Sequence, residues 1–356
     1  MTSSSSRGSH RIRHHVRPLL IGLAALGVAV VVAAPLTSLR LSQSMEAASY
    51  LYQRVSVALR LTSPSEMKMD ASGVPVVDFG FKQGEFIGEQ VNPLAVAAAG
   101  RQHLLEYERT GDAAALDKAE NCLTWLEEAA VWNGAAAVWE YWYPTSYIAE
   151  LPYYSALAQA NIMRTLVLGE QVMGLGRYRA LIDGIIVSLN TAIVDGGCME
   201  PVGDDEGKWF AELASPYRSQ PPYILNGHME VLLRLHEYWE SSGDGRARDL
   251  FDAGVLALKG LLPQYDAGRW SYYDLEGNWA YDYHYTHIDE LRQLYVLTSE
   301  PTFAEYAVRW ESYFPWNPWW ARKRLAAYLL NVAIVWVVIA GGLLVWWLVR
   351  RNRGRT

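Results

Sequence analysis

The stretch LPQYDAGRWSYYDLEGNWAYDYHYTHIDEL, residues 262–291, organises this chain. It holds six tyrosines, two tryptophans and two histidines. Turn signals at residues 266–268 and 276–278 predict two short strands or extended arms, followed by a helix that begins near Thr286. A tyrosine combines an apolar ring with a proton-transfer group, so this density suits a carbohydrate cleft. An aromatic mini-core under a hairpin is the alternative, and composition alone favours that alternative.

The sequence around this stretch predicts helical hairpins. Residues 104–126, 232–262 and 291–314 each contain two amphipathic segments separated by a Gly-Asp or Ser-Glu turn, and residues 154–173 and 178–193 form another pair. Such hairpins bury their apolar stripes by stacking on their neighbours. The pattern therefore predicts a mainly α domain, an α/α toroid whose inter-helix loops converge on a cleft. Short strands are expected in residues 74–86, ahead of the helices.

Two apolar segments flank this domain in a chain of 356 residues with a net charge of -7. Residues 18–36 and 325–349 are each long enough to cross a hydrocarbon core of about 30 Å as a helix. The tail before the first segment is basic and lacks acidic residues, which marks the cytoplasmic side. The predicted topology is a two-pass membrane protein with cytoplasmic termini and an extracytoplasmic domain. A cleaved signal peptide is the alternative for the first segment.

The expected division of the chain follows from these segments. It comprises a basic cytoplasmic tail (1–17), a transmembrane anchor (18–36), a linker with short strands (37–91), the exported helical domain (92–314), a transmembrane helix (325–349) and a second basic tail (350–356). The lipid bilayer is thus one partner, whereas nucleic acid is not expected, because the basic run adjoins a membrane segment. Cys122 and Cys198 leave open one disulfide or two buried thiols. No metal site or cofactor is predicted, and the oligomeric state, including a homodimer, stays open.

Five motifs resemble one known family. They are YYSALAQA (153–160), YILNGHM (223–229), YYDL (272–275), DYHYTHIDEL (282–291) and FAEYAVRWESYF (303–314). In this order they resemble the C-terminal domain of D-glucuronyl C5-epimerase, over roughly residues 92–314. That family inverts C5 of a uronic acid within a polysaccharide, turning D-glucuronate into L-iduronate. The resemblance therefore implies a uronic-acid-containing polysaccharide as the substrate. A β-rich domain that precedes the helices in the animal enzymes has no counterpart in this chain.

Matching motif to motif, the resemblance implies three catalytic residues. Tyr273 of YYDL and Tyr283 of DYH match the family's two catalytic tyrosines, and Glu212 matches a glutamate ahead of the LNG motif. Inversion removes a proton next to a carboxylate and returns one to the opposite face, so a proton-transfer group is needed on each face. A phenolate base requires a nearby cation or dipole, because tyrosine titrates near pH 10. Leu213 stands where the family has a tyrosine beside the glutamate.

A second group of residues is expected to bind the substrate. Tyr154 and Asn226 resemble residues that line the family cleft, and Tyr217 is a candidate to replace the tyrosine missing at Leu213. Arg269, His284 and His287 supply positive charge or hydrogen-bond donors for the substrate carboxylate or for the tyrosines. Without the resemblance, Asn226 would be read as a helix cap and Tyr154 as a core residue.

The sequence thus predicts a membrane-anchored isomerase that epimerises uronic acid residues in a polysaccharide. A uronate lyase on the same fold begins with the same proton abstraction and stays an alternative. A glycoside hydrolase requires two opposed carboxylates, and no such pair stands out in the sequence. A non-catalytic glycan-binding domain is the remaining alternative, favoured by Leu213 and by the missing β-rich domain.

Overall fold

The computed structural model describes residues 22–37, 41–59, 66–82, 85–174, 176–203, 206–313 and 318–353. The chain forms two compact units. One comprises residues 60–317, and the other combines residues 1–59 with residues 318–356. Each unit is described by itself below.

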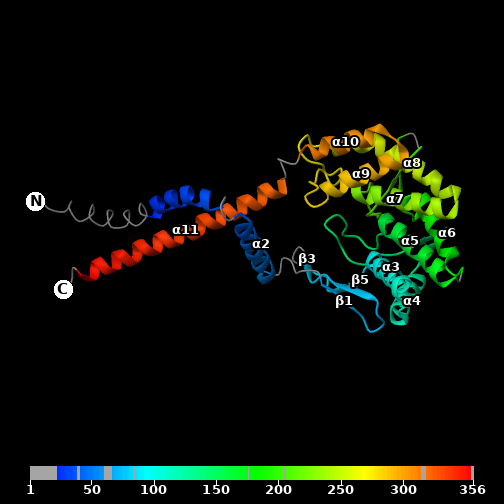
Figure 1. The fold of residues 1–356 in the computed structure, drawn as a ribbon, viewed down its shortest axis with the longest axis horizontal. Helices are drawn as coiled ribbons and strands as arrows, with labels where there is room; N and C mark the ends of the chain where they lie inside the picture. Colours follow the sequence, from blue (N-terminus) through cyan, green and yellow to red (C-terminus); the bar gives the residue numbers. More distant parts are fainter. Residues whose placement is uncertain are drawn as a thin grey trace, which may run out of the picture. The chain divides into compact units, whose positions relative to one another are not determined.

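In its described residues, the unit of residues 60–317 is built from four helical hairpins (Figure 1). They are α3 (Pro93–Thr110) with α4 (Ala113–Glu128), α5 (Ala156–Met173) with α6 (Arg179–Asn190), α7 (Leu225–Ser242) with α8 (Gly245–Leu261), and α9 (His284–Thr298) with α10 (Pro301–Glu311). The first helices of the hairpins, α3, α5, α7 and α9, pack on one another in that order, and each also packs on its own partner. The predicted mainly α class and the predicted hairpins are confirmed.

Local turn chemistry explains where the hairpins bend. Gly111 ends α3 with a φ of 70°, a conformation that glycine adopts without a steric penalty. Asp112 then caps α4, because its side chain accepts a hydrogen bond of 3.0 Å from the Ala114 N–H. Gly243 and Asp244 play the same two roles between α7 and α8. The Gly-Asp pairs therefore encode the ends and starts of these helices directly.

The strands are short and antiparallel. Before α3, β1 (Glu66–Met69), β2 (Pro75–Asp78) and β5 (Glu89–Val91) form one sheet, while β3 (Phe81–Lys82) pairs with β4 (Glu85–Phe86). This confirms the strands expected in residues 74–86. Two further hairpins lie between helices, β6 (Val131–Asn133) with β7 (Ala136–Val138), and β8 (Met199–Val202) with β9 (Gly207–Phe210). These two were not predicted, because three- and four-residue strands carry too little alternation to be recognised.

Residues 266–283 differ from the expected pair of arms. They form turns and bends with single bridges between Asp266 and Ser271 and between Tyr272 and Trp279. The helix α9 begins at His284, two residues from the predicted start near Thr286. The buried Asp274 explains the irregular course, because its Oδ1 accepts hydrogen bonds from the backbone N–H groups of Glu276 and Asn278. A side chain that satisfies these donors replaces a strand partner.

One large hydrophobic cluster fills this unit. Its largest fully buried side chains include Trp139, Trp209 and Trp310. Cys122 and Cys198 are both buried and free, so the alternative of two thiols is the one that the structure shows. Burial raises the pKa of the Cys122 thiol to about 11, which keeps it protonated and unreactive.

The terminal unit contains the helix Gly22–Thr37, α2 (Leu41–Ala58) and α11 (Pro318–Arg353). Within α11, Leu325–Trp346 is long and apolar enough to cross a membrane, with a mean hydropathy of 2.4. The described part of the first apolar segment is shorter, and residues 18–21 lie outside the described residues. The structure thus shows one candidate span. The tail of residues 1–17 and residues 354–356 of the second tail also lie outside the described residues.

The two apolar helices of the terminal unit pack against each other in opposite directions. Trp336 donates a hydrogen bond of 3.1 Å to the Gly22 carbonyl, and Tyr328 donates one of 3.0 Å to the Val30 carbonyl. Asn331, the one polar residue of the second segment, donates to Thr37 Oγ1 at 2.9 Å and to Ser44 Oγ at 3.0 Å. In an apolar surrounding, such a contact satisfies an amide that would otherwise lack a partner.

Candidate active site

Backbone hydrogen bonds bring three distant segments together at one end of α7 and α9. The Leu225 N–H, in the first turn of α7, donates to the Tyr273 carbonyl at 3.0 Å, and the Leu275 N–H donates to the Pro222 carbonyl at 3.1 Å. The segment after β9 pairs with Tyr154 through two bonds of 2.9 Å at Ala214. Tyr273, Glu212 and the start of α7 are therefore held by the main chain itself.

Tyr273 and Tyr283 lie side by side. Their ring centroids are 5.1 Å apart and the ring planes are tilted by 40°. Tyr273 is half-buried, whereas Tyr283 is 42% exposed. Burial raises the pKa of both phenols, and the nearby Glu212 raises it further. Both tyrosines are thus protonated at neutral pH. Among the described residues, no cation lowers the pKa of either, as a phenolate base would need.

Glu212 places a carboxyl group beside both tyrosines. Its Oε2 is buried and has no hydrogen-bond partner among the described residues. Burial raises the pKa of Glu212 to about 7. The carboxyl fits only because residue 227 is glycine: a Cβ at Gly227 would lie 2.3 Å from Glu212 Oε2. The glycine of the LNG motif thus makes room for the glutamate.

Three further buried side-chain oxygens lack a partner among the described residues: Gln159 Oε1 on α5, Asn226 Oδ1 in the first turn of α7, next to Gly227, and Glu290 Oε2 on α9. Glu290, on α9, was not singled out from the sequence. Burial, with smaller contributions from Glu230 and Glu212 and against an opposing effect of Arg234, raises the pKa of Glu290 to about 9. Buried polar atoms are usually paired, so Asn226 Oδ1 and Glu290 Oε2 together with Glu212 Oε2 mark a place where a polar ligand supplies the missing bonds. The signal in the sequence was the i, i+3 spacing that puts Glu290 on the same face of α9 as His287.

His284 and His287 both contact Ser271, and their predicted role in substrate binding stays a prediction. His284 Nδ1 accepts a hydrogen bond of 3.1 Å from the Ser271 N–H, so its Nε2 carries the proton that it donates to the Trp310 carbonyl at 3.1 Å. Ser271 Oγ lies 2.8 Å from His284 Nδ1 and 3.0 Å from His287 Nδ1. Burial lowers the pKa of His284 to about 4 and that of His287 to about 3, so both are neutral. His287 Nε2 has no partner among the described residues.

The structure does not bring three of the predicted substrate-binding residues to the tyrosine pair. Tyr154 is buried, and its hydroxyl oxygen accepts a hydrogen bond of 3.4 Å from Asn133 Nδ2. Tyr217 is 57% exposed on the loop after β9. Arg269 is exposed, and its guanidinium lies over the Trp279 ring, 5.3 Å from the centroid. Each stays a prediction as a substrate contact.

The tyrosine next to Tyr154 is nearer to the carboxyl. Glu212 contributes to raising the pKa of Tyr153 and of Tyr141, although burial is the main cause for both. These two rings stack with centroids 5.0 Å apart, and Tyr143 packs edge-on against both. Neighbouring side chains of an extended segment point to opposite sides, so the YYS motif sends one tyrosine to Asn133 and the other toward Glu212.

A hydrogen-bonded group of loop residues holds Tyr273 in place. The Tyr147 hydroxyl donates to Asp274 Oδ2 at 2.5 Å, and Asn278 Nδ2 donates to the same oxygen at 2.8 Å. Arg218 donates to Glu276 Oε1 at 2.6 Å and also to the Tyr147 carbonyl. Because three loops share these bonds, the backbone on either side of Tyr273 is fixed before any ligand binds. Among the described residues, no cluster of His, Cys, Asp and Glu side chains is arranged to hold a metal ion.

The match of a family model to the helical-hairpin domain places this chain in the class of carbohydrate epimerases. More specifically, the chain belongs to the D-glucuronyl C5-epimerase family, whose C-terminal domain matches residues 127–312.

Two proteins are similar to this chain in sequence. An uncharacterised protein of Methanocaldococcus jannaschii is 27% identical over 288 residues, which cover 73% of this chain and 89% of that protein. The D-glucuronyl C5-epimerase of Caenorhabditis elegans is 30% identical over 126 residues, which cover 30% of this chain and 20% of the worm protein.

Solved structures with a similar arrangement are more distant. Cellobiose 2-epimerase from Spirochaeta thermophila has a TM-score of 0.45 at 15% identity. The superposed region covers 81% of this chain and 72% of the epimerase chain. A GH76 α-mannanase from Bacteroides thetaiotaomicron has a TM-score of 0.41 at 11% identity, with coverages of 80% and 70%.

Proposed function

We propose that this protein inverts C5 of uronic acid residues in a polysaccharide, with Tyr273 and Tyr283 as the two proton-transfer groups. The observation that carries the proposal is the contact of the two phenol rings, 5.1 Å apart, beside the buried carboxyl of Glu212. At this separation no sugar ring fits between the phenol rings. The uronate therefore binds across their hydroxyl ends, or the exposed Tyr283 moves aside to admit it.

In this proposal Glu212 carries a proton between the tyrosines. One phenol oxygen takes the C5 proton while its own proton passes to the Glu212 carboxylate, so no free phenolate accumulates. The second phenol gives its proton to the opposite face of C5 and is restored from Glu212. The pKa of about 7 suits this task, because a base works best when it titrates near the working pH. The unpaired Oε2 supports the proposal, since it is free to accept the proton.

The substrate carboxylate requires neutralisation as C5 becomes a carbanion. Arg269 lies against Trp279, so we assign this task to neutral hydrogen-bond donors instead. Asn226 Nδ2 is one such donor, while the unpaired Asn226 Oδ1 can only accept a hydrogen bond, for example from a substrate hydroxyl. Glu290, whose raised pKa of about 9 keeps it protonated, presents a carboxylic acid O–H. A carboxylic acid in an apolar site that donates to a developing negative charge is an established means of stabilising a carbanion.

A glycoside hydrolase is the second candidate, because Glu212 and Glu290 form the pair of carboxyls that the sequence did not reveal. A hydrolase keeps one carboxylate ionised at its working pH while the other is the acid. Here burial raises the pKa of both groups, to about 7 and about 9, and neither has a cation within ion-pair distance among the described residues. This arrangement favours proton transfer over glycosidic cleavage.

The decisive experiment is incubation of the full-length protein with uronate polymers in deuterated water. We expect deuterium at C5, inversion of part of the uronates and no change in chain length. Label uptake should rise with pH up to about 7, as Glu212 ionises. Unsaturated chain ends would identify a lyase, and shortened saturated chains would identify a hydrolase. Failure to label or to shorten any uronate polymer would leave only the glycan-binding alternative.

We also propose that the protein crosses the membrane twice, with the helical domain outside and both termini in the cytoplasm. The antiparallel contact of the helix Gly22–Thr37 with α11, through Tyr328, Asn331 and Trp336, supports a hairpin of two spans. The basic, acid-free tail of residues 1–17 supports its orientation.

Cysteine labelling tests this topology. Val194→Cys, at a position 77% exposed in the helical domain, should react with a membrane-impermeant maleimide in intact cells. Ser5→Cys, in the basic tail, should react only after lysis. The parent protein is the matched control, because Cys122 and Cys198 are buried and should stay unlabelled. The reverse pattern of labelling would overturn the topology.

A further inference from the structure

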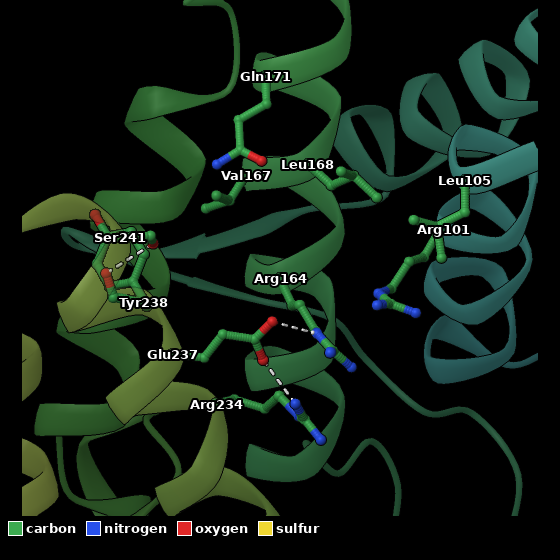
Figure 2. Close-up of a pocket in the computed structure, with 10 residues that line it drawn as sticks. All are labelled: Arg101, Leu105, Arg164, Val167, Leu168, Gln171, Arg234, Glu237, Tyr238 and Ser241. Atoms are coloured by element: carbon green, nitrogen blue, oxygen red, sulfur yellow. Dashed lines mark hydrogen bonds and ion pairs between the residues drawn. The ribbon is translucent and has the colours of Figure 1, made fainter. Parts of the chain in front are cut away.

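A positively charged pocket lies between α3, α5 and α7, and none of its lining residues belongs to the candidate active site. Its volume is about 130 Å³. Arg101 comes from α3, Arg164 from α5 and Arg234 from α7, and Figure 2 shows the guanidinium groups of Arg101 and Arg164 turned toward each other across it. Leu105, Val167 and Leu168 supply apolar walls.

The ion pairs in the pocket do not use all of its positive charge. Arg164 pairs with Glu237 at 2.9 Å, and Arg234 pairs with Glu230 at 2.8 Å and with Glu237 at 2.6 Å. Three guanidinium groups therefore meet two carboxylates, and one positive charge remains. Arg101 carries it, because no hydrogen bond or ion pair joins its side chain to another described residue.

The unpaired charge is held under unfavourable conditions. Desolvation lowers the pKa of Arg101, and the like charges of Arg164 and Arg234 lower it further, against a partial opposing effect of Glu237. A guanidinium that is partly desolvated beside two others ordinarily has an anion in its fork. The protein as a whole carries a net charge of -7, so this local excess of positive charge stands against the overall balance.

We propose that Arg101, Arg164 and Arg234 form a second ligand site, which binds one oxyanion group of a small molecule. The fork of Arg101 matches the two oxygens of a carboxylate, sulfate or phosphate. The small volume excludes a polymer segment, and the leucine and valine walls accommodate a short apolar part of the ligand. Two kinds of ligand carry such an oxyanion group: a free inorganic anion, and an acidic sugar with its carboxylate. The experiment below distinguishes them.

Titration calorimetry of the full-length protein with sodium sulfate, sodium phosphate and D-glucuronate tests the proposal. We expect saturable binding of at least one anion, and a dissociation constant raised about tenfold or more in Arg101→Gln, which lacks the charged fork. Arg101→Lys should lie between, because it keeps the charge but not the fork. If sulfate or phosphate binds more tightly than D-glucuronate, the ligand of the pocket is an inorganic anion. If D-glucuronate binds more tightly than either inorganic anion, the ligand is an acidic sugar.

Arg109→Gln is the matched control, because Arg109 is an exposed residue of the same helix outside the pocket and its loss removes the same charge. It should bind the anions as the parent does. Without added anion, Arg101→Gln should melt at the same or a higher temperature than the parent, since a like-charge repulsion is removed. The site would be overturned by any of three results. These are equal anion binding by Arg101→Gln and the parent, an equal loss of anion affinity in Arg101→Gln and Arg109→Gln, or no saturable anion binding by the parent. If D-glucuronate binds Arg101→Gln as tightly as the parent, that binding is attributed to the candidate active site and not to the pocket.

Discussion

Phenylalanine at Tyr273 or at Tyr283 is expected to lower the rate of C5 inversion about 10²–10⁴-fold while the protein stays folded. The substitution keeps the ring contact at 5.1 Å and removes only a hydroxyl. Neither hydroxyl makes a hydrogen bond to another described residue, so no partner inside the protein is left unsatisfied. The loss therefore falls on proton transfer rather than on stability. The measurement is the rate of inversion of a uronate polymer, followed by nuclear magnetic resonance.

The two substitutions should differ in deuterated water, because each tyrosine serves one face of the sugar. The variant that retains the proton-abstracting tyrosine should still exchange the C5 proton with solvent without inverting the centre. Tyr285→Phe is the matched control: Tyr285 is 45% exposed and packs edge-on against Trp270, and its hydroxyl has no assigned role. Wild-type inversion in both Tyr273→Phe and Tyr283→Phe would remove the tyrosine mechanism. A comparable loss in Tyr285→Phe would point to disturbed packing instead.

The helical hairpins were predictable because their determinants are local. An apolar stripe at helical spacing defines each helix, and a Gly-Asp pair such as Gly111 with Asp112 defines two of the four bends, so no distant contact is needed to place them. The proximity of Tyr273 to Tyr283 was also predictable, since the two residues are only ten positions apart in the sequence. Their common relation to Glu212 came from motif matching, because contacts between β9, α7 and the stretch before α9 are not local.

The remaining site features depend on burial, which the sequence does not display. The sequence does not display that the Nδ1 atoms of His284 and His287 turn to Ser271, or that His287 Nε2 is left, unpaired among the described residues, for the predicted substrate contact. Glu290 was not singled out from the sequence, because only the packing of α7 against α9 buries it. The arginine pocket combines residues of three helices, and only the packing of α3, α5 and α7 brings Arg101 to Arg164 and Arg234.

Replacing Glu290 with glutamine should change how the stability of the protein depends on pH. Burial holds the pKa of Glu290 near 9, against an ordinary value of 4.5. Below about pH 4.5 the carboxyl is protonated in both the folded and the unfolded chain. Between these two values it ionises only in the unfolded chain, so the free energy of unfolding falls as pH rises, by about 1.4 kcal/mol per pH unit. Glutamine has a similar shape and does not titrate, so Glu290→Gln should lack this decline.

Denaturant titrations of the full-length chain in detergent, at pH 5 and pH 8, measure the difference. We expect Glu290→Gln to gain up to about 4 kcal/mol on the parent over this interval. The fall caused by Glu212 is common to both proteins and cancels in the comparison. Glu305→Gln is the control, because Glu305 is exposed on α10, and its curve should follow that of the parent. Parallel curves for Glu290→Gln and the parent would mean that Glu290 is ionised in the folded protein, and the neutral donor assigned to the substrate carboxylate would be lost with it.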